Sequence, residues 1–295
     1  MITTNKKQIN VKSKEDKHEE INLILKSLED GVRDVFDSEK YKKYLEFFGK
    51  FHHYSFNNVM LILMQCPHAQ KCASYTTWKS LKMQVRKGEQ GIKILCPVPY
   101  SYTKKEKLTE EDGEESSYYL VSGVKFRIGH VFDISQVDGD MPTLANELTD
   151  NSECLQDIID KLIGCSPTPI FYDYSLNKNQ GNGYYELDTK RIALRAGMSS
   201  LQTLKTLIHE IAHSLLHNDD KFSIRDAEVQ AESIAYVVCS SLGLDTSEYS
   251  FEYVASWSEG KELKELRSSL TVIDMTSKKI IDWIEVCSSM KNTAC

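Results

Sequence analysis

Two histidines and a glutamate in the segment Leu201 to Asp219 have the spacing of a metal site. His209 and His213 lie four residues apart, so on a helix both imidazoles project from one face and can hold one ion. Glu210 follows His209 directly, where its carboxylate can act as general base towards a water on the metal. This H-E-x-x-H pattern predicts a zinc centre, and the reaction we expect of it is attack on a peptide carbonyl.

The local sequence predicts the helix that such a pair of histidines needs. Ser199, with Gln202 three residues later, is typical of a capped helix start. The apolar residues then recur at helical spacing as one buried stripe: Leu204, Leu207, Ile208, Ile211, Ala212, Leu215 and Leu216.

The third ligand has to come from another element. No histidine follows His217, which lies one more turn along the same helix, and three residues in a row along one helix cannot surround a tetrahedral ion. We therefore interpret His217 as a helix C-terminal residue or as a contact of a ligand. A carboxylate is the expected third ligand.

The next helix, predicted from a cap at Ser223 to a stop at Gly243, offers two carboxylates. Glu228 and Glu232 share one face with two alanines, which would allow a close approach to the histidine helix. We expect Glu228 to be the ligand and Glu232 to orient a ligating imidazole, with the reverse assignment left open.

A hairpin is predicted just upstream, from Gly183 to Arg195, with a polar turn at residues 188–190. Its last strand feeds into the metal helix and could form one edge of a cleft, which would hold an extended peptide by main-chain pairing. Tyr236 and Tyr185 are candidates for stabilising an oxyanion there.

Composition places the chain among globular proteins long enough for two domains. It has 295 residues, of which 41% are hydrophobic and 27% charged. No apolar run approaches the ~18 residues of a membrane span, and the polar first residues do not resemble an export signal. The eight cysteines form no C-x-x-C pair and are interpreted as reduced thiols, so we expect a cytoplasmic protein without membrane contact.

Charge is distributed unevenly along the chain. Residues 40–107 hold 13 Lys and Arg against three acidic residues, together with eleven aromatic residues. Cations for phosphates and rings for unstacked bases are the footprint of a surface for single-stranded nucleic acid. Aromatic residues at helical spacing equally favour a buried core, and composition alone does not separate these two interpretations.

The pattern along the chain predicts an α+β protein. We expect a disordered tail over 1–16, one domain over 17–137, a linker over 138–151 and a second domain over 152–295. In the first domain, helices are expected from Glu19, Ser38, Ser55 and Thr76 or Thr77. They are followed by a strand over 92–97, a mobile loop over 103–117 and two returning strands between Tyr118 and Ile134.

Both halves resemble one known arrangement. The runs FHHYSFNNVMLILMQCP, YTTW, VRKGEQGIKILCP and FRIGHVFDISQVDG resemble the N-terminal domain of ArdC-type antirestriction proteins of mobile genetic elements. The runs GYYELDTKRIALRAGMSSLQTLKTLIHEIAHSLLH and EVQAESIAYVVCSSLGL resemble the metallopeptidase domain of the same proteins and the wider ImmA/IrrE-like zinc peptidases.

The resemblance implies a helical and β-hairpin domain that binds single-stranded DNA, joined to a gluzincin-like zinc metallopeptidase domain. It places the metal ligands on His209, His213 and Glu228 and the catalytic carboxylate on Glu210. It places DNA contact around eight residues: Tyr54, Ser55, Asn57, Asn58, Gln65, Trp78, Lys87 and Gly88.

The implied role is protection of incoming mobile DNA from host restriction, with single-stranded DNA and a protein substrate as partners. Zn²⁺ is the expected ion because two imidazoles and a carboxylate suit it, although Mn²⁺ or another divalent ion can occupy such a site. Two alternatives remain. In one, the protein coats DNA and its metal site is structural or regulatory; in the other, it is a peptidase that cleaves a transcriptional regulator.

Overall fold

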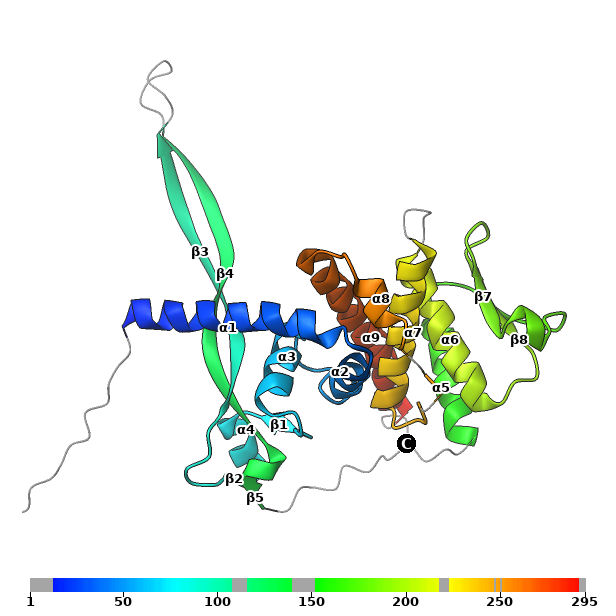
Figure 1. The fold of residues 1–295 in the computed structure, drawn as a ribbon, viewed down its shortest axis with the longest axis horizontal. Helices are drawn as coiled ribbons and strands as arrows, with labels where there is room; N and C mark the ends of the chain where they lie inside the picture. Colours follow the sequence, from blue (N-terminus) through cyan, green and yellow to red (C-terminus); the bar gives the residue numbers. More distant parts are fainter. Residues whose placement is uncertain are drawn as a thin grey trace, which may run out of the picture.

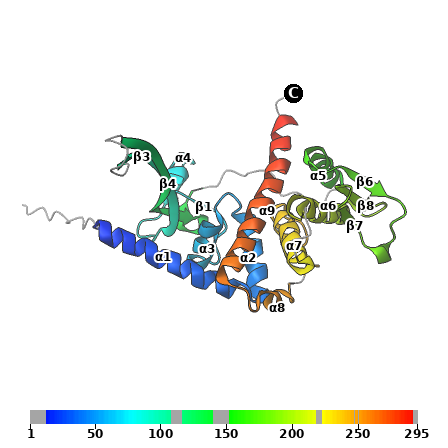
Figure 2. The same ribbon diagram turned by 90° about the horizontal axis from the view of Figure 1, so that it is seen from above.

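The computed structural model shows an α+β protein in which a long two-stranded ribbon projects from a helical body (Figure 1). A small three-stranded sheet lies at the opposite end, and the central helices separate it from the ribbon in both views (Figure 2). The described residues are 13–107, 116–139, 152–217, 223–246, 248–249 and 251–291. Residues 1–12 of the expected tail and 140–151 of the expected linker lie outside them.

Three helices open the described chain: α1 (Lys14–Val35), α2 (Ser38–Lys50) and α3 (Phe56–Gln65). Helix α1 begins earlier than expected because Ser13 accepts a hydrogen bond from the backbone N–H of Asp16, while the Asp16 carboxylate accepts one from the N–H of Ser13. The last residues of the predicted tail are therefore helical. The predicted helix start at Ser55 is confirmed, whereas α2 is preceded by Asp37 rather than by Ser38.

Aromatic residues of these helices fill the core. Tyr41, Tyr44 and Phe48 are almost fully buried, and the Tyr41 hydroxyl lies 2.8 Å from the Ser233 hydroxyl on α7 (Ile224–Ser241). Gly49 allows this close packing, since a Cβ there would lie 3.1 Å from the backbone oxygen of Val237. For this part of the chain, the core interpretation of the aromatic pattern is correct.

The ribbon consists of β3 (Ile92–Lys107) and β4 (Ser116–Asp133), which pair antiparallel without a break in register. The two strands extend into both ends of the loop expected over 103–117, so its predicted bounds are wrong. The two returning strands that were expected form a single strand, β4. Low apolar content suggested a loop there. A projecting ribbon has both faces in solvent, however, so its strands need no buried side chains. Residues 108–115 lie outside the described part.

A second, smaller core lies at the base of the ribbon. It is built on Trp78 in α4 (Tyr75–Ser80), with Met83, Val85 and Val137 around the ring. Two short strands, β2 (Gln84–Val85) and β5 (Val137–Asp138), pair beside it, and β1 (Cys72–Ala73) pairs with β4. Helix α4 is capped by Ser74 rather than opened by Thr76 or Thr77.

The sheet at the other end follows α5 (Ser152–Cys165) and contains β6 (Ile170–Asp173), β7 (Gly183–Glu186) and β8 (Arg191–Arg195). The predicted hairpin is confirmed as the antiparallel pair of β7 and β8. Because the strand order is β6-β8-β7, the strand that feeds the metal helix is the central one. Strands β6 and β7 are the two edges, and β7, not β8, is the strand that lines the cleft.

The remaining helices are α6 (Ser200–Leu216), α8 (Val254–Ser258) and α9 (Leu263–Lys291). The main apolar core joins α1–α3 to α5–α9 in one cluster, with Phe36 and Trp257 rings 5.6 Å apart across it. The division into domains at 138–151 stays a prediction. Among the described residues, no helix is long and apolar enough to cross a membrane. Six cysteines whose side chains are described are free thiols: Cys66, Cys72, Cys96, Cys154, Cys165 and Cys239.

Candidate metal centre

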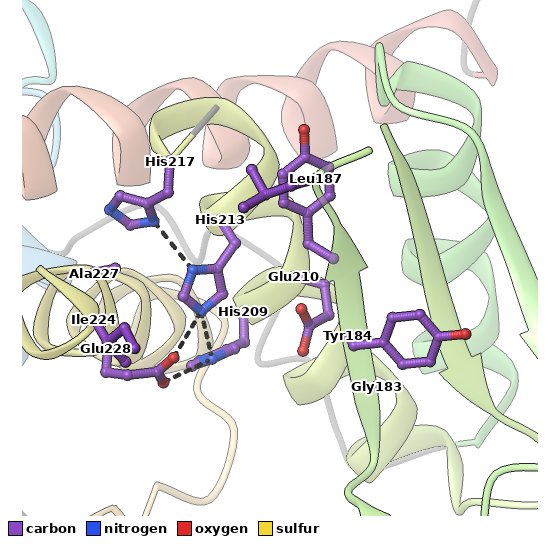
Figure 3. A pocket seen from close by; sticks show the side chains of 11 residues that line it. Gly183, Tyr184, Leu187, His209, Glu210, His213, His217, Ile224, Ala227 and Glu228 are labelled. Carbon is purple, nitrogen blue, oxygen red and sulfur yellow. Dashed lines mark hydrogen bonds and ion pairs between the residues drawn. The ribbon is translucent and has the colours of Figure 1, made fainter. Parts of the chain in front are cut away.

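Helix α6 holds the two histidines at the wall of a cleft. Its start after Ser199 is confirmed, with the Ser199 hydroxyl accepting from the N–H of Gln202. The stripe from Leu204 to Ala212 is buried and fixes the rotation of the helix, so that His209 and His213 face β7 and α7. The cleft between them has a volume of about 580 Å³ (Figure 3).

Three potential ligand atoms converge at this point. His209 Nε2 and His213 Nε2 are 3.0 Å apart, and each lies 3.5 Å from an oxygen of the Glu228 carboxylate (Figure 3). Ligands about 2.1 Å from a tetrahedral ion are about 3.4 Å from one another, so these spacings fit a single ion. The trio is also one of two groups among the described residues whose atoms could share a metal.

The two glutamates of α7 have different surroundings. Glu228 approaches the histidines, whereas the Glu232 carboxylate accepts a hydrogen bond from the hydroxyl of Tyr253. Burial raises the pKa of Glu232, and the Tyr253 bond opposes this only in part. The geometry thus favours Glu228 over Glu232 as a ligand. We expected Glu232 to bond to a ligating imidazole, but its carboxylate bonds to the hydroxyl of Tyr253.

Glu210 lies beside the cleft with a carboxylate suited to accept a proton. It is 6% exposed, and burial raises its pKa to about 7 although the neighbouring His209 lowers it. The backbone N–H of Tyr185 donates to this carboxylate. Strand β7 passes close to α6 at Gly183, where a Cβ would meet Thr206 Cγ2 at 2.7 Å and Glu210 Cγ at 3.3 Å. A glycine is therefore needed to keep Glu210 in place.

A chain of buried hydrogen bonds determines which nitrogen of His213 is free. Gln230 Nε2 donates to the hydroxyl of Ser269, which leaves its Oε1 to accept from His217 Nε2 at 3.1 Å. Neutral His217 then accepts at Nδ1 from His213 Nδ1, 3.0 Å away. Burial lowers the pKa of both His213 and His217, which keeps them neutral. His213 therefore presents an unprotonated Nε2 to the cleft.

This arrangement predicts that Gln230 acts on metal affinity without touching the metal. We expect Gln230→Leu to weaken Zn²⁺ binding about 10- to 100-fold, because the tautomer of His217 is no longer fixed. Gln230→Glu keeps an acceptor and should restore most of the affinity. Competition with a chromophoric chelator measures both variants, and equal thermal melting of the metal-free proteins controls for folding. Unchanged affinity in Gln230→Leu would contradict the role.

The cleft continues past the metal centre. A second cavity of about 290 Å³ shares Gly183, His209 and Glu210 with the first and extends towards Lys205 and Glu248. The cavities thus flank His209 and Glu210, with the edge strand β7 alongside. This is a shape that an extended chain can occupy with side chains in both cavities.

Of the two tyrosines considered for an oxyanion, only one lies at the cleft. Tyr185 lines it, whereas Tyr236 is 2% exposed and packs against the rings of Tyr249 and Phe251. Tyr236 as an oxyanion partner is therefore a wrong expectation. Its spacing in α7 places it on the core side of the helix.

Several residues expected to contact DNA hold the ribbon to the body. Asn58 donates to the backbone oxygen of Leu95 and accepts from its N–H, and Gln65 makes the same pair of bonds with Lys93. Trp78 is fully buried and donates to the carbonyl of Phe132. These bonds give the three side chains a structural role, and their contact with DNA stays a prediction.

The other five expected DNA residues are spread over the fold. Tyr54 donates to the carbonyl of Cys72, and the side-chain oxygen of Asn57 accepts from Arg267 on α9. Ser55 is exposed at the start of α3, while Lys87 and Gly88 lie in the exposed turn between β2 and β3, where Gly88 has a φ of 96°. DNA contact by these five residues stays a prediction.

Fold and site together define an α+β protein with an H-E-x-x-H helix facing a glutamate-bearing helix across a cleft. Residues 14–132 match the family model of the N-terminal domain of the anti-restriction factor ArdC. The N-terminal part of the chain is thus similar to the N-terminal domain of ArdC.

Relatives match over more of the chain. An uncharacterized Bacillus anthracis protein is 27% identical over 328 residues, covering 96% of this chain and 54% of that protein, so the chain spans about half the length of this relative. Metal-free and Mn(II)-bound crystal structures of the antirestriction protein ArdC from plasmid R388 are 24% and 22% identical. Both cover 79% of this chain and 84% of theirs, with TM-scores of 0.42.

Proposed function

We propose that this chain is an antirestriction protein that binds single-stranded DNA and hydrolyses a peptide bond at a metal centre on α6 and α7. The observation that carries the hydrolytic part is the convergence of His209, His213 and Glu228, with Glu210 beside them. Two imidazoles and one carboxylate form the ligand set of hydrolytic zinc sites.

The roles of the residues follow from their positions. A bound divalent ion supplies Lewis acidity, which acidifies water and polarises a carbonyl. Strand β7 runs along the cleft at the edge of its sheet, where an extended peptide can lie, and the two cavities take side chains on either side of the cleaved bond. Glu210 accepts the proton of the attacking water and returns it to the leaving amine, and burial holds its pKa near the value that such a shuttle needs.

Removal of the metal tests this proposal. Protein stripped by a chelator should fail to cleave a degenerate peptide library read by mass spectrometry, and stoichiometric Zn²⁺ should restore cleavage, with Mn²⁺ compared in parallel. Affinity for single-stranded DNA should not change, because the ribbon and the metal centre lie at opposite ends of the molecule (Figure 1). A library left intact by the reloaded protein would reject the hydrolytic part.

For DNA binding, the ribbon offers exposed aromatic and basic side chains. By the register of β3 and β4, one face carries Tyr100, Tyr102, Tyr119, Lys104 and Lys125, which we call the tyrosine face. Tyr100 and Tyr102 rings are 6.2 Å apart and nearly parallel, and Tyr100 lies across Gly123, where a Cβ would be 2.7 Å from its hydroxyl. Lys125 Nζ lies over the Tyr100 ring and Lys104 Nζ over the Tyr119 ring. Rings and cations side by side on one face favour binding of unpaired bases and their phosphates.

The tyrosine face predicts that removal of both Tyr100 and Tyr102 strongly weakens DNA binding. We expect Tyr100→Ala with Tyr102→Ala to weaken binding of a single-stranded oligonucleotide by about 10- to 100-fold, since stacking is worth about 1–3 kcal/mol per base. Lys125→Gln should reduce the log–log salt slope by about 0.7 if Lys125 contacts one phosphate. Fluorescence anisotropy from low to high salt measures both effects.

The opposite face of the ribbon provides the control. Leu120 and Val124 are 70% and 56% exposed there, and Leu120→Ala with Val124→Ala should leave the DNA affinity unchanged. Equal losses on both faces, or binding that does not respond to salt, would indicate a protein partner for the basic half instead of DNA.

A further inference from the structure

A second group of metal-ligating side chains lies far from α6, where the turn after α2 meets α9. His52 and His53 come from the turn, and Glu285 comes from α9. One nitrogen or oxygen atom from each lies within 4.8 Å of the others. The two imidazole rings have centroids 3.9 Å apart with an angle of 52° between their planes, so they are not stacked face to face.

The tautomer of His52 is determined by the backbone. Its Nδ1 is 3.0 Å from the carbonyl oxygen of Gly49, and a carbonyl only accepts, so Nδ1 carries the proton. In neutral His52, Nε2 is therefore an acceptor. That atom is buried, makes no hydrogen bond among the described residues and lies 3.5 Å from Glu285 Oε1. A lone pair thus faces a carboxylate, and both are electron donors.

A cation between the two atoms resolves this conflict. The 3.5 Å from His52 Nε2 to Glu285 Oε1 equals the nitrogen–oxygen separations at His209 and His213, and it fits two ligands of one tetrahedral ion.

Protonation of His52 is the competing explanation. An imidazolium would donate from Nε2 to Glu285, but the distance and geometry do not give a hydrogen bond, and the Nε2 atom has no access to water. A bound cation would give the buried Nε2 atom of His52 a partner, and it would also use the imidazole of His53, which lies within reach of the same point.

We propose that His52, His53 and Glu285 form a second divalent-cation site, suited to Zn²⁺, which fastens the turn between α2 and α3 to α9. Two imidazoles and one carboxylate are the donors that this ion prefers, with the remaining position open to water. The site is independent of the proposed hydrolysis, since it shares no residue with the cleft on α6.

The test uses full-length protein in which His209→Ala and His213→Ala remove the first site. Equilibrium dialysis against Zn²⁺, followed by elemental analysis, should find two ions per wild-type chain and one in this background. Adding His53→Ala or Glu285→Gln to the background should weaken the remaining binding at least tenfold. Both side chains are exposed, so neither change should alter the fold. His130→Ala and Glu252→Gln, at exposed positions elsewhere, should change nothing.

Two outcomes of the dialysis experiment would overturn the proposed second site. If the background variant binds no Zn²⁺, or if its Zn²⁺ survives both His53→Ala and Glu285→Gln, the second site does not exist. Thermal melting gives an independent readout, because Zn²⁺ should raise the melting temperature of the background protein but not that of its His53→Ala derivative.

Discussion

Glu228→Gln is expected to lower the affinity of the α6 centre for Zn²⁺ by about 100-fold or more, which corresponds to about 2.7 kcal/mol. The substitution keeps the size of the side chain and removes the anionic oxygens that lie 3.5 Å from His209 and His213. Glu228 is half exposed, so the metal-free fold should not change. Isothermal titration, with His53→Ala present to silence the proposed second site, measures the difference.

Glu232→Gln is the matched control for this experiment. The residue lies one turn further along α7, but its carboxylate is bonded to Tyr253 and not to an imidazole. We expect a change of less than threefold in Zn²⁺ affinity. If Glu232→Gln were the more damaging change, the ligand assignment would have to be reversed, with Glu228 as the neighbouring acceptor.

The convergence of His209, His213 and Glu228 could be predicted from the sequence because its information is local. The four-residue spacing of His209 and His213, the cap at Ser199 and the small residues beside Glu228 all act within one or two helical turns. The role of Gln230 could not be predicted this way, since it depends on how α7 and α9 meet around His217 and Ser269. Contacts of this kind are set by tertiary packing and leave no pattern along the chain.

In the N-terminal half, the sequence pattern alone did not separate core residues from functional ones. Its aromatic residues follow a helical period, which fits a core as well as a nucleic-acid surface, and burial decides for the core at Tyr41 and Tyr44. Asn58 and Gln65 are polar residues whose partners are backbone atoms of β3, so their chemistry alone suggested a ligand. The alternation of Tyr100, Tyr102 and Lys104 with a serine and a threonine was a signal for a strand of the ribbon, masked by the low apolar content around it.

Glu210→Gln is expected to abolish peptide hydrolysis while the metal stays bound. Removal of a general base slows such a step by about 10²- to 10⁴-fold, and the amide still accepts from the N–H of Tyr185, so the local structure should persist. Elemental analysis verifies the metal content, and cleavage of the peptide library measures the rate. A variant that loses metal as well as activity would indicate that Glu210 is needed for the structure of the site.

The same substitution separates catalysis from DNA binding in cells. If protection of incoming DNA depends on hydrolysis, Glu210→Gln should lose it, whereas Tyr100→Ala with Tyr102→Ala should reduce it through weaker DNA binding alone. Transfer of a plasmid into a restricting host gives the readout for both variants at equal protein levels. Full protection by Glu210→Gln together with loss in the tyrosine variant would mean that coating the single strand is sufficient. The metal centre would then serve stability or regulation, a role that stripping the metal and measuring unfolding would test directly.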